Sequence, residues 1–153
     1  MKKIIFALLA ISFLGSCSVT KKKSTTPKKE SYKVLLETTQ GNITLQLYKD
    51  VPQHANNFLK LVKEGFYDSV LFHRVIPQFM IQGGDPQSKT ANANQSLGGG
   101  SNGYQIPAEF NVAKYIHKKG ALAAARTGNP EKKSSGCQFY IVEGKIFTDA
   151  DLN

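Results

Sequence analysis

Residues 72–85 combine one arginine with apolar and amide side chains at close spacing. The segment contains Arg74, the apolar pair Phe79 and Met80, and Gln82, and it ends in two glycines and an aspartate. An arginine guanidinium is permanently charged and presents its donors in a fixed fork, and methionine supplies an adaptable apolar wall. These residue types can hold an apolar ring beside a fixed positive charge.

A second segment of interest runs from Gly120 to Arg126 and continues, after a polar loop, from Ser135 to Ile141. It contains Cys137, but nothing charged stands nearby to activate the thiol, so we expect inert packing. The three histidines are scattered without ligand spacing, and we expect neither a metal site nor a cofactor. They are His54, His73 and His117.

Both segments resemble the signature segments of cyclophilins. The similarity is ordered and runs from about Tyr32 to Val142, including the Gly98–Gly100 stretch and residues 107–110. The resemblance implies a mainly β fold, an eight-stranded antiparallel barrel flanked by two helices. It also implies that the chain is a cofactor-independent peptidyl-prolyl cis/trans isomerase.

By the same resemblance, the catalytic residues are Arg74, which takes the role of the arginine, and Gln82; Gln82 and Gln138 match glutamines that bind substrate backbone and orient the arginine. The matched substrate-binding positions are Phe79, Met80, Ala125, Arg126, Gln138 and Tyr140. Arg126 stands where many members have asparagine. Tyr140 stands where phenylalanine is usual, so its hydroxyl must find a partner or water. Residue type alone leaves other readings open: a structural ion pair for the arginine, ordinary core for Phe79 and Met80, and solvent-facing amides for the glutamines.

The implied reaction explains these residue types. Rotation about an X–Pro bond sacrifices amide resonance, with a barrier of roughly 18–20 kcal/mol for peptide bonds. A guanidinium aimed at the twisted nitrogen forms a hydrogen bond that strengthens only as resonance is lost. Five powers of ten in rate require roughly 7 kcal/mol, whereas one charge-assisted hydrogen bond supplies roughly 1.5–3 kcal/mol. Preorganised electrostatics and positioning must therefore share the work.

The elements that position these residues can be predicted in part. An apolar run at residues 34–36, turn residues at 39–42 and clean alternation at 43–47 predict a β-hairpin. Pro52 opens a predicted helix that Gly65 ends. Its apolar stripe follows helical spacing and consists of Ala55, Phe58, Leu59 and Val62.

Short β segments are expected around residues 71–75, 79–82, 121–125 and 138–142, with a glycine-rich loop at 97–103. Many short strands with few helices favour a barrel or sandwich. The chain stops at Asn153, before the closing strands, the second helix and the late pocket residues that the resemblance implies. Residues 148–151 look like a capped helix start. We therefore expect an incomplete barrel and a fragment of a longer gene product, with residues 31–153 as its partial isomerase domain.

The N-terminus resembles a bacterial lipoprotein signal. Lys2 and Lys3 precede an apolar run too short to span a bilayer, which closes on Gly15, Ser16 and Cys17. We expect residues 1–16 to be removed, Cys17 to be lipidated, and residues 17–30 to form a polar basic tether. The domain would then face the periplasm. The alternative is an ordinary signal with a coincidental cysteine.

The net charge of +9 comes mainly from this N-terminal region. Seven of the 20 basic residues precede residue 31, and the rest of the chain carries a net charge of +3. No basic stripe interleaved with aromatic residues is present, so nucleic acid is not an expected partner. The expected partners are proline-containing polypeptides and, through Cys17, the membrane; we expect a monomer.

Three functions remain open from the sequence. The first is an isomerase that accelerates folding of exported proteins whose slow step is X–Pro rotation. The second is a non-catalytic, chaperone-like module that binds proline-containing segments. The third is a basic surface adhesin. Arg74 favours the first, because a pure binding module would not need it.

Overall fold

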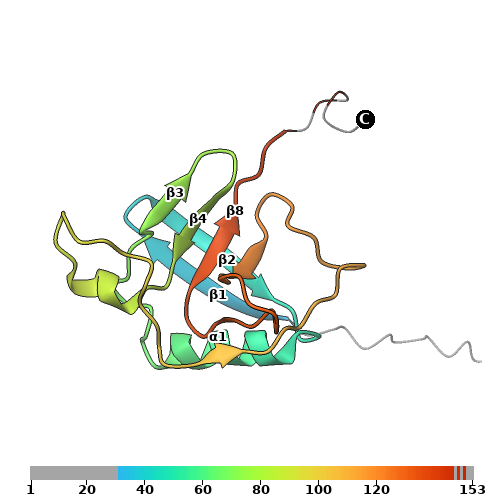
Figure 1. Ribbon diagram of the computed structural model, residues 1–153, viewed down its shortest axis with the longest axis horizontal. Helices are drawn as coiled ribbons and strands as arrows, with labels where there is room; N and C mark the ends of the chain where they lie inside the picture. The colour runs from blue at the N-terminus through green and yellow to red at the C-terminus, as the bar shows by residue number, and fades with distance from the viewer. Residues whose placement is uncertain (1–30, 147, 149, 151–153) are drawn as a thin grey trace, which may run out of the picture.

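The computed structural model describes residues 31–146, 148 and 150, and it is built mainly of β-strands (Figure 1). The elements follow in the order β1 (Tyr32–Thr38), β2 (Gly41–Leu47), α1 (Pro52–Lys63), β3 (Arg74–Ile76), β4 (Met80–Gly83), the 3₁₀ helix η1 (Pro86–Thr90), β5 (Gln105–Ile106), β6 (Leu122–Ala124), β7 (Ser134–Ser135) and β8 (Phe139–Val142). The predicted signal, lipidated Cys17 and tether lie outside the described residues. No described helix is long and apolar enough to cross a bilayer.

The predicted hairpin is confirmed. Strands β1 and β2 pair antiparallel over their full length, from Tyr32 opposite Leu47 to Thr38 opposite Gly41. Gly41 has a φ of 123°, a conformation that only glycine adopts freely, so the turn depends on it. The alternation of β2 buries Leu45 and Leu47, as expected for a strand with one face on the core.

The predicted helix is also confirmed, with one difference in its buried face. Helix α1 begins at Pro52, and Gly65 follows it with a φ of 65°. Ala55 is buried as predicted, but the most buried helix residue is Leu61, at 3% exposure, which the predicted stripe omitted. The face of α1 that packs on the core is therefore centred nearer to Leu61 than the helical spacing of apolar residues predicted.

The N-terminus of α1 is capped from a distant part of the chain. Val51 at the N-cap position makes no side-chain cap. The two carboxylate oxygens of Glu109 instead accept hydrogen bonds from the backbone N–H groups of Gln53 (3.0 Å) and His54 (2.9 Å). A cap of this kind contributes about 1 kcal/mol to helix stability.

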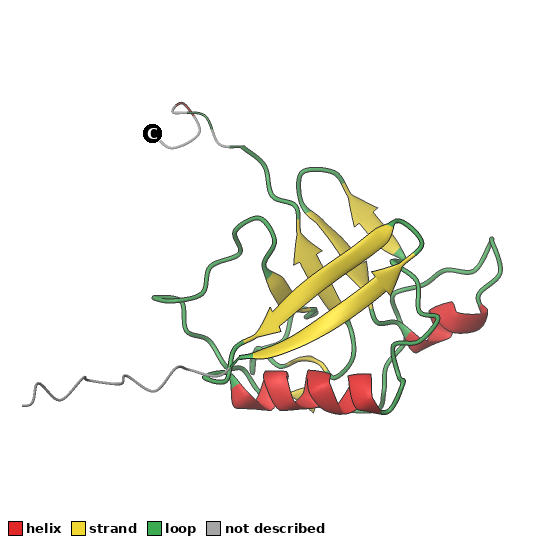
Figure 2. Ribbon diagram, turned by 180° about the vertical axis from the view of Figure 1, so that it is seen from behind, coloured by secondary structure: helices red, strands yellow, loops and turns green. Residues whose placement is uncertain are grey.

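The strands of the described region form three separate sheets, not a closed barrel. They are the β1–β2 pair, a four-stranded antiparallel sheet in the order β3-β4-β8-β6, and the short β5–β7 pair. Figure 2 shows the β1–β2 hairpin lying across the four-stranded sheet, with α1 along one end of both. No ladder of hydrogen bonds joins the outer strands β3 and β6 to the hairpin in this part of the chain, so no closed barrel forms there, and the incomplete barrel stays a prediction. The resemblance implies two flanking helices, the second of which was expected to be missing from this chain; the described region holds α1 and the short η1, and the helix start predicted at 148–151 lies partly outside it.

The core between α1 and the four-stranded sheet is aromatic. Phe139 of β8 makes edge contacts with Phe58, Tyr67 and Phe72, at ring-centroid distances of 5.5, 5.4 and 6.2 Å. Such edge-to-face pairs are favourable beyond the area they bury. Burial raises the pKa of Tyr67, whose hydroxyl donates to the carbonyl of Cys137 at 3.1 Å. This contact ties the segment before β8 to the core.

The position of Leu61 predicts a large effect of its truncation. Leu61→Ala should lower the free energy of unfolding by about 2–4 kcal/mol, because it leaves a cavity beneath α1. Leu35→Ala, on a side chain that is 57% exposed, should cost less than about 1 kcal/mol. Urea unfolding followed by circular dichroism measures both. Equal losses in the two variants would contradict the packing described.

Candidate active site

The strand register places three of the candidate positions in one row across the four-stranded sheet, together with Ala123. Arg74 of β3 stands opposite Gln82 of β4, Gln82 opposite Tyr140 of β8, and Tyr140 opposite Ala123 of β6. Directly paired residues project to the same face of a sheet. Arg74, Gln82 and Tyr140 are therefore neighbours on one face, although 66 residues separate the first from the last.

An apolar row lies next to this polar row on the same face. Ile76, Met80 and Val142 face one another across β3, β4 and β8, two residues along each strand. Met80 is only 1% exposed. Phe79 lies outside the rows, in the turn before β4, where its side chain is half exposed and its carbonyl accepts from the N–H groups of Glu143 and Gly144. Met80 and Val142 are buried, so the apolar side chains that remain accessible beside the charged group are Phe79 and, in part, Ile76.

A chain of amide hydrogen bonds orients the arginine. Arg74 donates from Nη1 to Oε1 of Gln82 at 3.3 Å, and Gln82 donates from Nε2 to Oε1 of Gln138 at 2.9 Å. Gln138 in turn donates from Nε2 to the carbonyls of Gly98 (3.0 Å) and Gly100 (2.7 Å). Because Gln138 is 7% exposed and its amide protons are engaged by these carbonyls, its oxygen must face Gln82. The structure brings together Arg74, Gln82 and Gln138.

Asp85 fixes the far end of this chain, and the sequence analysis did not single it out as a site residue. Its side chain is fully buried; Oδ2 accepts from the N–H groups of Gly98 (2.6 Å) and Gly100 (3.2 Å), and Oδ1 from that of Gln87 (2.8 Å). A Cβ on Gly100 would stand 1.9 Å from Oδ1, so only glycine fits there. The signal in the sequence was an aspartate after a glycine pair, followed by a glycine run.

The charge state of Asp85 follows from these contacts. Burial alone would raise the pKa of the carboxyl, but the donors of Gly98, Gln87 and Gly100 outweigh it and hold the pKa below its ordinary value. Asp85 is therefore ionised at neutral pH and accepts all three hydrogen bonds. At neutral pH the glycine loop is therefore fixed by a carboxylate charge.

Ala125 and Arg126 differ in what they can offer a substrate. Ala125 donates its N–H to the carbonyl of Gln138 (2.9 Å), and its carbonyl accepts from the N–H of Ser135 (2.8 Å). Its main chain is thus engaged within the protein. Arg126 follows it, is exposed, and holds its guanidinium 5.7 Å from the ring centre of Phe110. Of the two, Arg126 is the better candidate for main-chain pairing with a bound peptide.

The hydroxyl of Tyr140 lies 3.3 Å from Nε2 of His117, within hydrogen-bonding distance. Burial raises the pKa of Tyr140, and the charge of Arg126 opposes this shift. The partner of this half-buried tyrosine is therefore a histidine that the sequence analysis set aside as isolated. The imidazole adds a polar group to the edge of the apolar row.

Cys137 lies beside the site but is poorly suited to react. It is 2% exposed, and burial raises the pKa of its thiol, so the thiolate is disfavoured. Among the residues that the structure describes, no three histidine, cysteine or acidic side chains gather closely enough to hold a metal ion.

The two carboxyls with lowered pKa values predict acid sensitivity. Donors from Gln53 and His54 hold the pKa of Glu109 below its ordinary 4.5 against the opposing effect of burial, as Asp85 is held below 3.8. A carboxyl of this kind stabilises the fold above its unfolded pKa, and the stabilisation is lost as pH falls through the folded pKa. The free energy of unfolding, measured with urea, should decline below about pH 4.5. Asp85→Asn should lower it at pH 7 and flatten the decline; an unchanged acid dependence in this variant would contradict the assignment.

Comparisons with known proteins show the family of the chain. Residues 33–150 match the model of the cyclophilin type peptidyl-prolyl cis-trans isomerase/CLD family. The chain is 43% identical to a peptidyl-prolyl cis-trans isomerase of Synechococcus elongatus over 70% of its own length and 66% of that protein. It is 37% identical to the peptidyl-prolyl isomerase cwc27 of Rhizopus delemar over 71% of its length, but spans only 20% of that relative.

Solved structures give the same result. A cyclophilin type isomerase of Cryptosporidium parvum superimposes with a TM-score of 0.65 at 27% identity, covering 76% of this chain and 70% of the other. A second structure of that protein, obtained in the presence of the dipeptide Ala-Pro, gives 0.58 at 26% identity over 75% and 70% of the two chains. The family match, the relatives and the fold lead to one conclusion: this chain belongs to the cyclophilin type peptidyl-prolyl cis-trans isomerases.

Proposed function

We propose that the chain catalyses cis/trans isomerisation of X–Pro bonds. The observation that carries this proposal is the guanidinium of Arg74 held by Gln82 next to the apolar row. The proline ring would lie against the accessible apolar side chains, Phe79 and Ile76, and the arginine would donate to the prolyl nitrogen as the amide twists. Because the nitrogen accepts this hydrogen bond only when resonance is lost, the interaction favours the transition state over the ground state.

Substrate orientation would come from the main chain at the edge of the sheet. Strand β6 pairs with β8 on one side only, and Arg126 lies just beyond its end. An extended peptide can pair with such an edge through main-chain hydrogen bonds. The Ala-Pro dipeptide used with the Cryptosporidium relative supports a proline-containing substrate for this chain as well.

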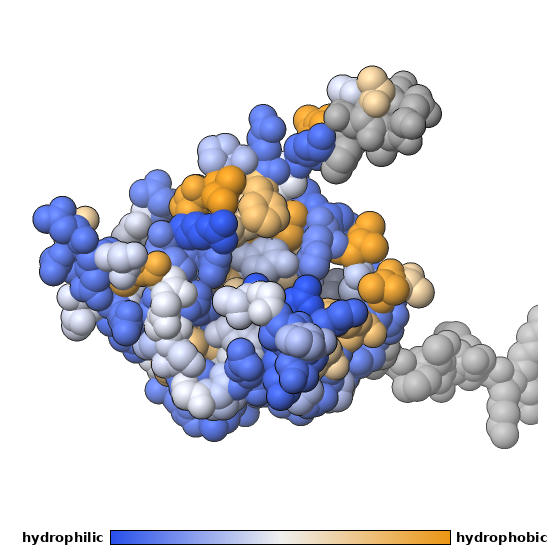
Figure 3. All heavy atoms as spheres, viewed as in Figure 1, coloured by the Kyte–Doolittle hydropathy of each residue, from blue (hydrophilic) through white to orange (hydrophobic). Residues whose placement is uncertain are grey.

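The alternative is a module that binds proline-containing segments without catalysis. The exposed apolar side chains give it some support, since large exposed apolar areas mark interaction sites. In Figure 3 apolar side chains gather over the β3–β4 hairpin and over the loop between β5 and β6, where Val75, Phe79, Phe110 and Val112 are at least half exposed. A variant of the arginine separates the two functions.

Arg74→Ala should reduce kcat/KM for an Ala-Pro peptide by about 100-fold, because it removes a donor worth roughly 2.7 kcal/mol in the transition state. Arg74→Lys keeps the charge but loses the fork, and should recover only part of the rate. Two-dimensional exchange NMR on the peptide measures both. Lys63→Ala, on an exposed lysine at the end of α1, controls for net charge and should leave the rate unchanged. Peptide binding without exchange that depends on Arg74 would favour the binding module.

The cellular setting is part of the same proposal. The N-terminal segment has two lysines, then an apolar run that ends at Gly15, Ser16 and Cys17, and this pattern supports export as a lipoprotein. The domain would be held on a tether and would face the periplasm. Clients would be exported polypeptides whose slow folding step is X–Pro rotation, taking tens of seconds or more at about 25 °C. We propose that the protein acts there as a monomer.

Cys17→Ala should release the full-length protein from the membrane fraction, because one or more acyl chains would no longer be attached. Expression in a bacterial host followed by fractionation and mass measurement tests this. Cys137→Ala is the matched control and should remain membrane-bound with its lipid mass intact. Retention of the Cys17 variant with an unlipidated mass would refute lipid anchoring and favour attachment through the basic tether.

A further inference from the structure

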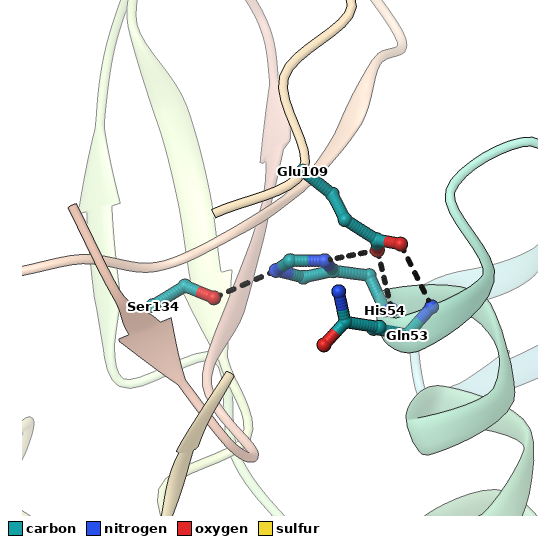
Figure 4. Close-up of polar contacts among 4 residues, drawn as sticks. All are labelled: Gln53, His54, Glu109 and Ser134. Carbon is teal, nitrogen blue, oxygen red and sulfur yellow. Dashed lines mark hydrogen bonds and ion pairs between the residues drawn. The ribbon is translucent and has the colours of Figure 1, made fainter. Parts of the chain in front are cut away.

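A polar cluster outside the candidate active site joins three segments of the chain (Figure 4). His54 of α1 lies with Nδ1 2.7 Å from Oε2 of Glu109 and with Nε2 2.8 Å from Oγ of Ser134 in β7. Glu109 also accepts from the backbone N–H groups at the start of α1. The side chains of His54 and Glu109 are 24% and 12% exposed, so the contacts are largely shielded from water.

The order serine, histidine, carboxylate is that of an acyl-transfer triad, but the serine cannot serve as a nucleophile here. Ser134 is only 6% exposed and lies within a strand paired to Ile106. A nucleophile must reach the substrate carbonyl while bonded to its base. The three side chains instead connect three segments: α1 through His54, the loop that follows β5 through Glu109, and β7 through Ser134. We call this group the His54–Glu109–Ser134 clamp.

The clamp holds the chain immediately before Gln138. After Ser134, the Oγ of Ser135 accepts from the N–H groups of Cys137 (3.2 Å) and Gln138 (3.0 Å), forming a tight turn. Asn57 of α1 donates from Nδ2 to the carbonyl of Gly136 at 2.7 Å. The position of the Gln138 side chain is therefore set relative to α1, and Gln138 is the link through which Gln82 and Arg74 are oriented.

The same segment fixes the substrate edge. Ser135, next to the clamp, donates its N–H to the carbonyl of Ala125, and Ala125 donates to the carbonyl of Gln138. Arg126 follows Ala125 directly. A shift of β7 would change the orientation of Arg74 and displace the main chain at Arg126 that is proposed to pair with substrate. Even small displacements of this kind lower the rate of catalysis.

We propose that the His54–Glu109–Ser134 clamp is a positioning device for isomerisation, acting through the turn at residues 135–138 on Gln138 and thus on Arg74. The inference rests on the proposed function. His54, Glu109 and Ser134 are positioning residues that do not touch substrate. Because the clamp sets the geometry of a group that acts in the transition state, its loss should affect turnover more than substrate binding.

The test compares Ser134→Ala, which breaks one bond of the clamp, with Ser134→Thr, which keeps the hydroxyl in a strand position that suits threonine. Glu109→Gln breaks the clamp at its other end. Tyr115→Phe is the matched control, since it removes a side-chain hydroxyl that donates to Asp50, outside the chain of contacts to Arg74. All are studied as the full chain, at a temperature where circular dichroism shows each variant folded.

We expect Ser134→Ala and Glu109→Gln to lower kcat for an Ala-Pro peptide by about 5–10-fold with KM changed less than about two-fold, and Ser134→Thr to restore it. The NMR resonances of the Gln82 and Gln138 side-chain amides and of Arg74 Nε should move in the first two variants alone. A kcat equal to that of Tyr115→Phe, or unmoved resonances, overturns the proposal. If the wild-type chain shows no isomerisation, the proposed function fails, and the resonances still decide the clamp.

Discussion

The site depends on a buried carboxylate that no solvent reaches. Asp85 accepts three backbone hydrogen bonds, two of them from the loop at Gly98–Gly100. The carbonyls of Gly98 and Gly100 in turn accept from the amide of Gln138 and hold it in place. Leaving a neutral polar group unpaired in such a place would cost about 1–3 kcal/mol, and leaving a charge unpaired would cost more. Each group in the series therefore stays bonded to the next. The series of hydrogen bonds begins at the carboxylate of Asp85, which accepts from backbone N–H groups of the glycine loop. Carbonyls of the same loop accept from the amide of Gln138, which accepts from Gln82, and Gln82 accepts from the guanidinium of Arg74. The exposed Arg74 is thus oriented by a group deep in the core.

This arrangement suits a reaction in which no covalent bond is broken. An arginine on a short edge strand, held by one 3.3 Å contact, would sample many rotamers if its acceptor were free to move. The amide chain removes that freedom from Gln82, and the period of two along each strand places an apolar row beside the polar one. Charge and apolar surface lie together because a single sheet face carries both.

The fold itself shows where local pattern is sufficient and where it is not. The hairpin and α1 were predicted because alternation, turn residues and helical spacing are properties of a few neighbouring residues. The buried position of Leu61 was missed because the direction from which the core contacts a helix depends on the sheet that lies beside it. In the described region the sheets stay separate, and whether β3 and β6 pair with further strands is a long-range property, to which strand count gives no answer.

The sequence by itself determined the family resemblance and the two signature segments, and hence Arg74, Gln82 and Gln138 as candidates. The order of residue types along a chain can be compared with a family pattern without knowledge of the fold. The tertiary structure alone decided that these three bond in series, that Asp85 anchors them, that Tyr140 has His117 as its partner, and that His54 meets Glu109 and Ser134. Most of these contacts join residues more than 10 positions apart, and the longest span 80. Strand register and loop closure bring such residues together, and neither leaves a periodic or compositional trace near the residues that it joins.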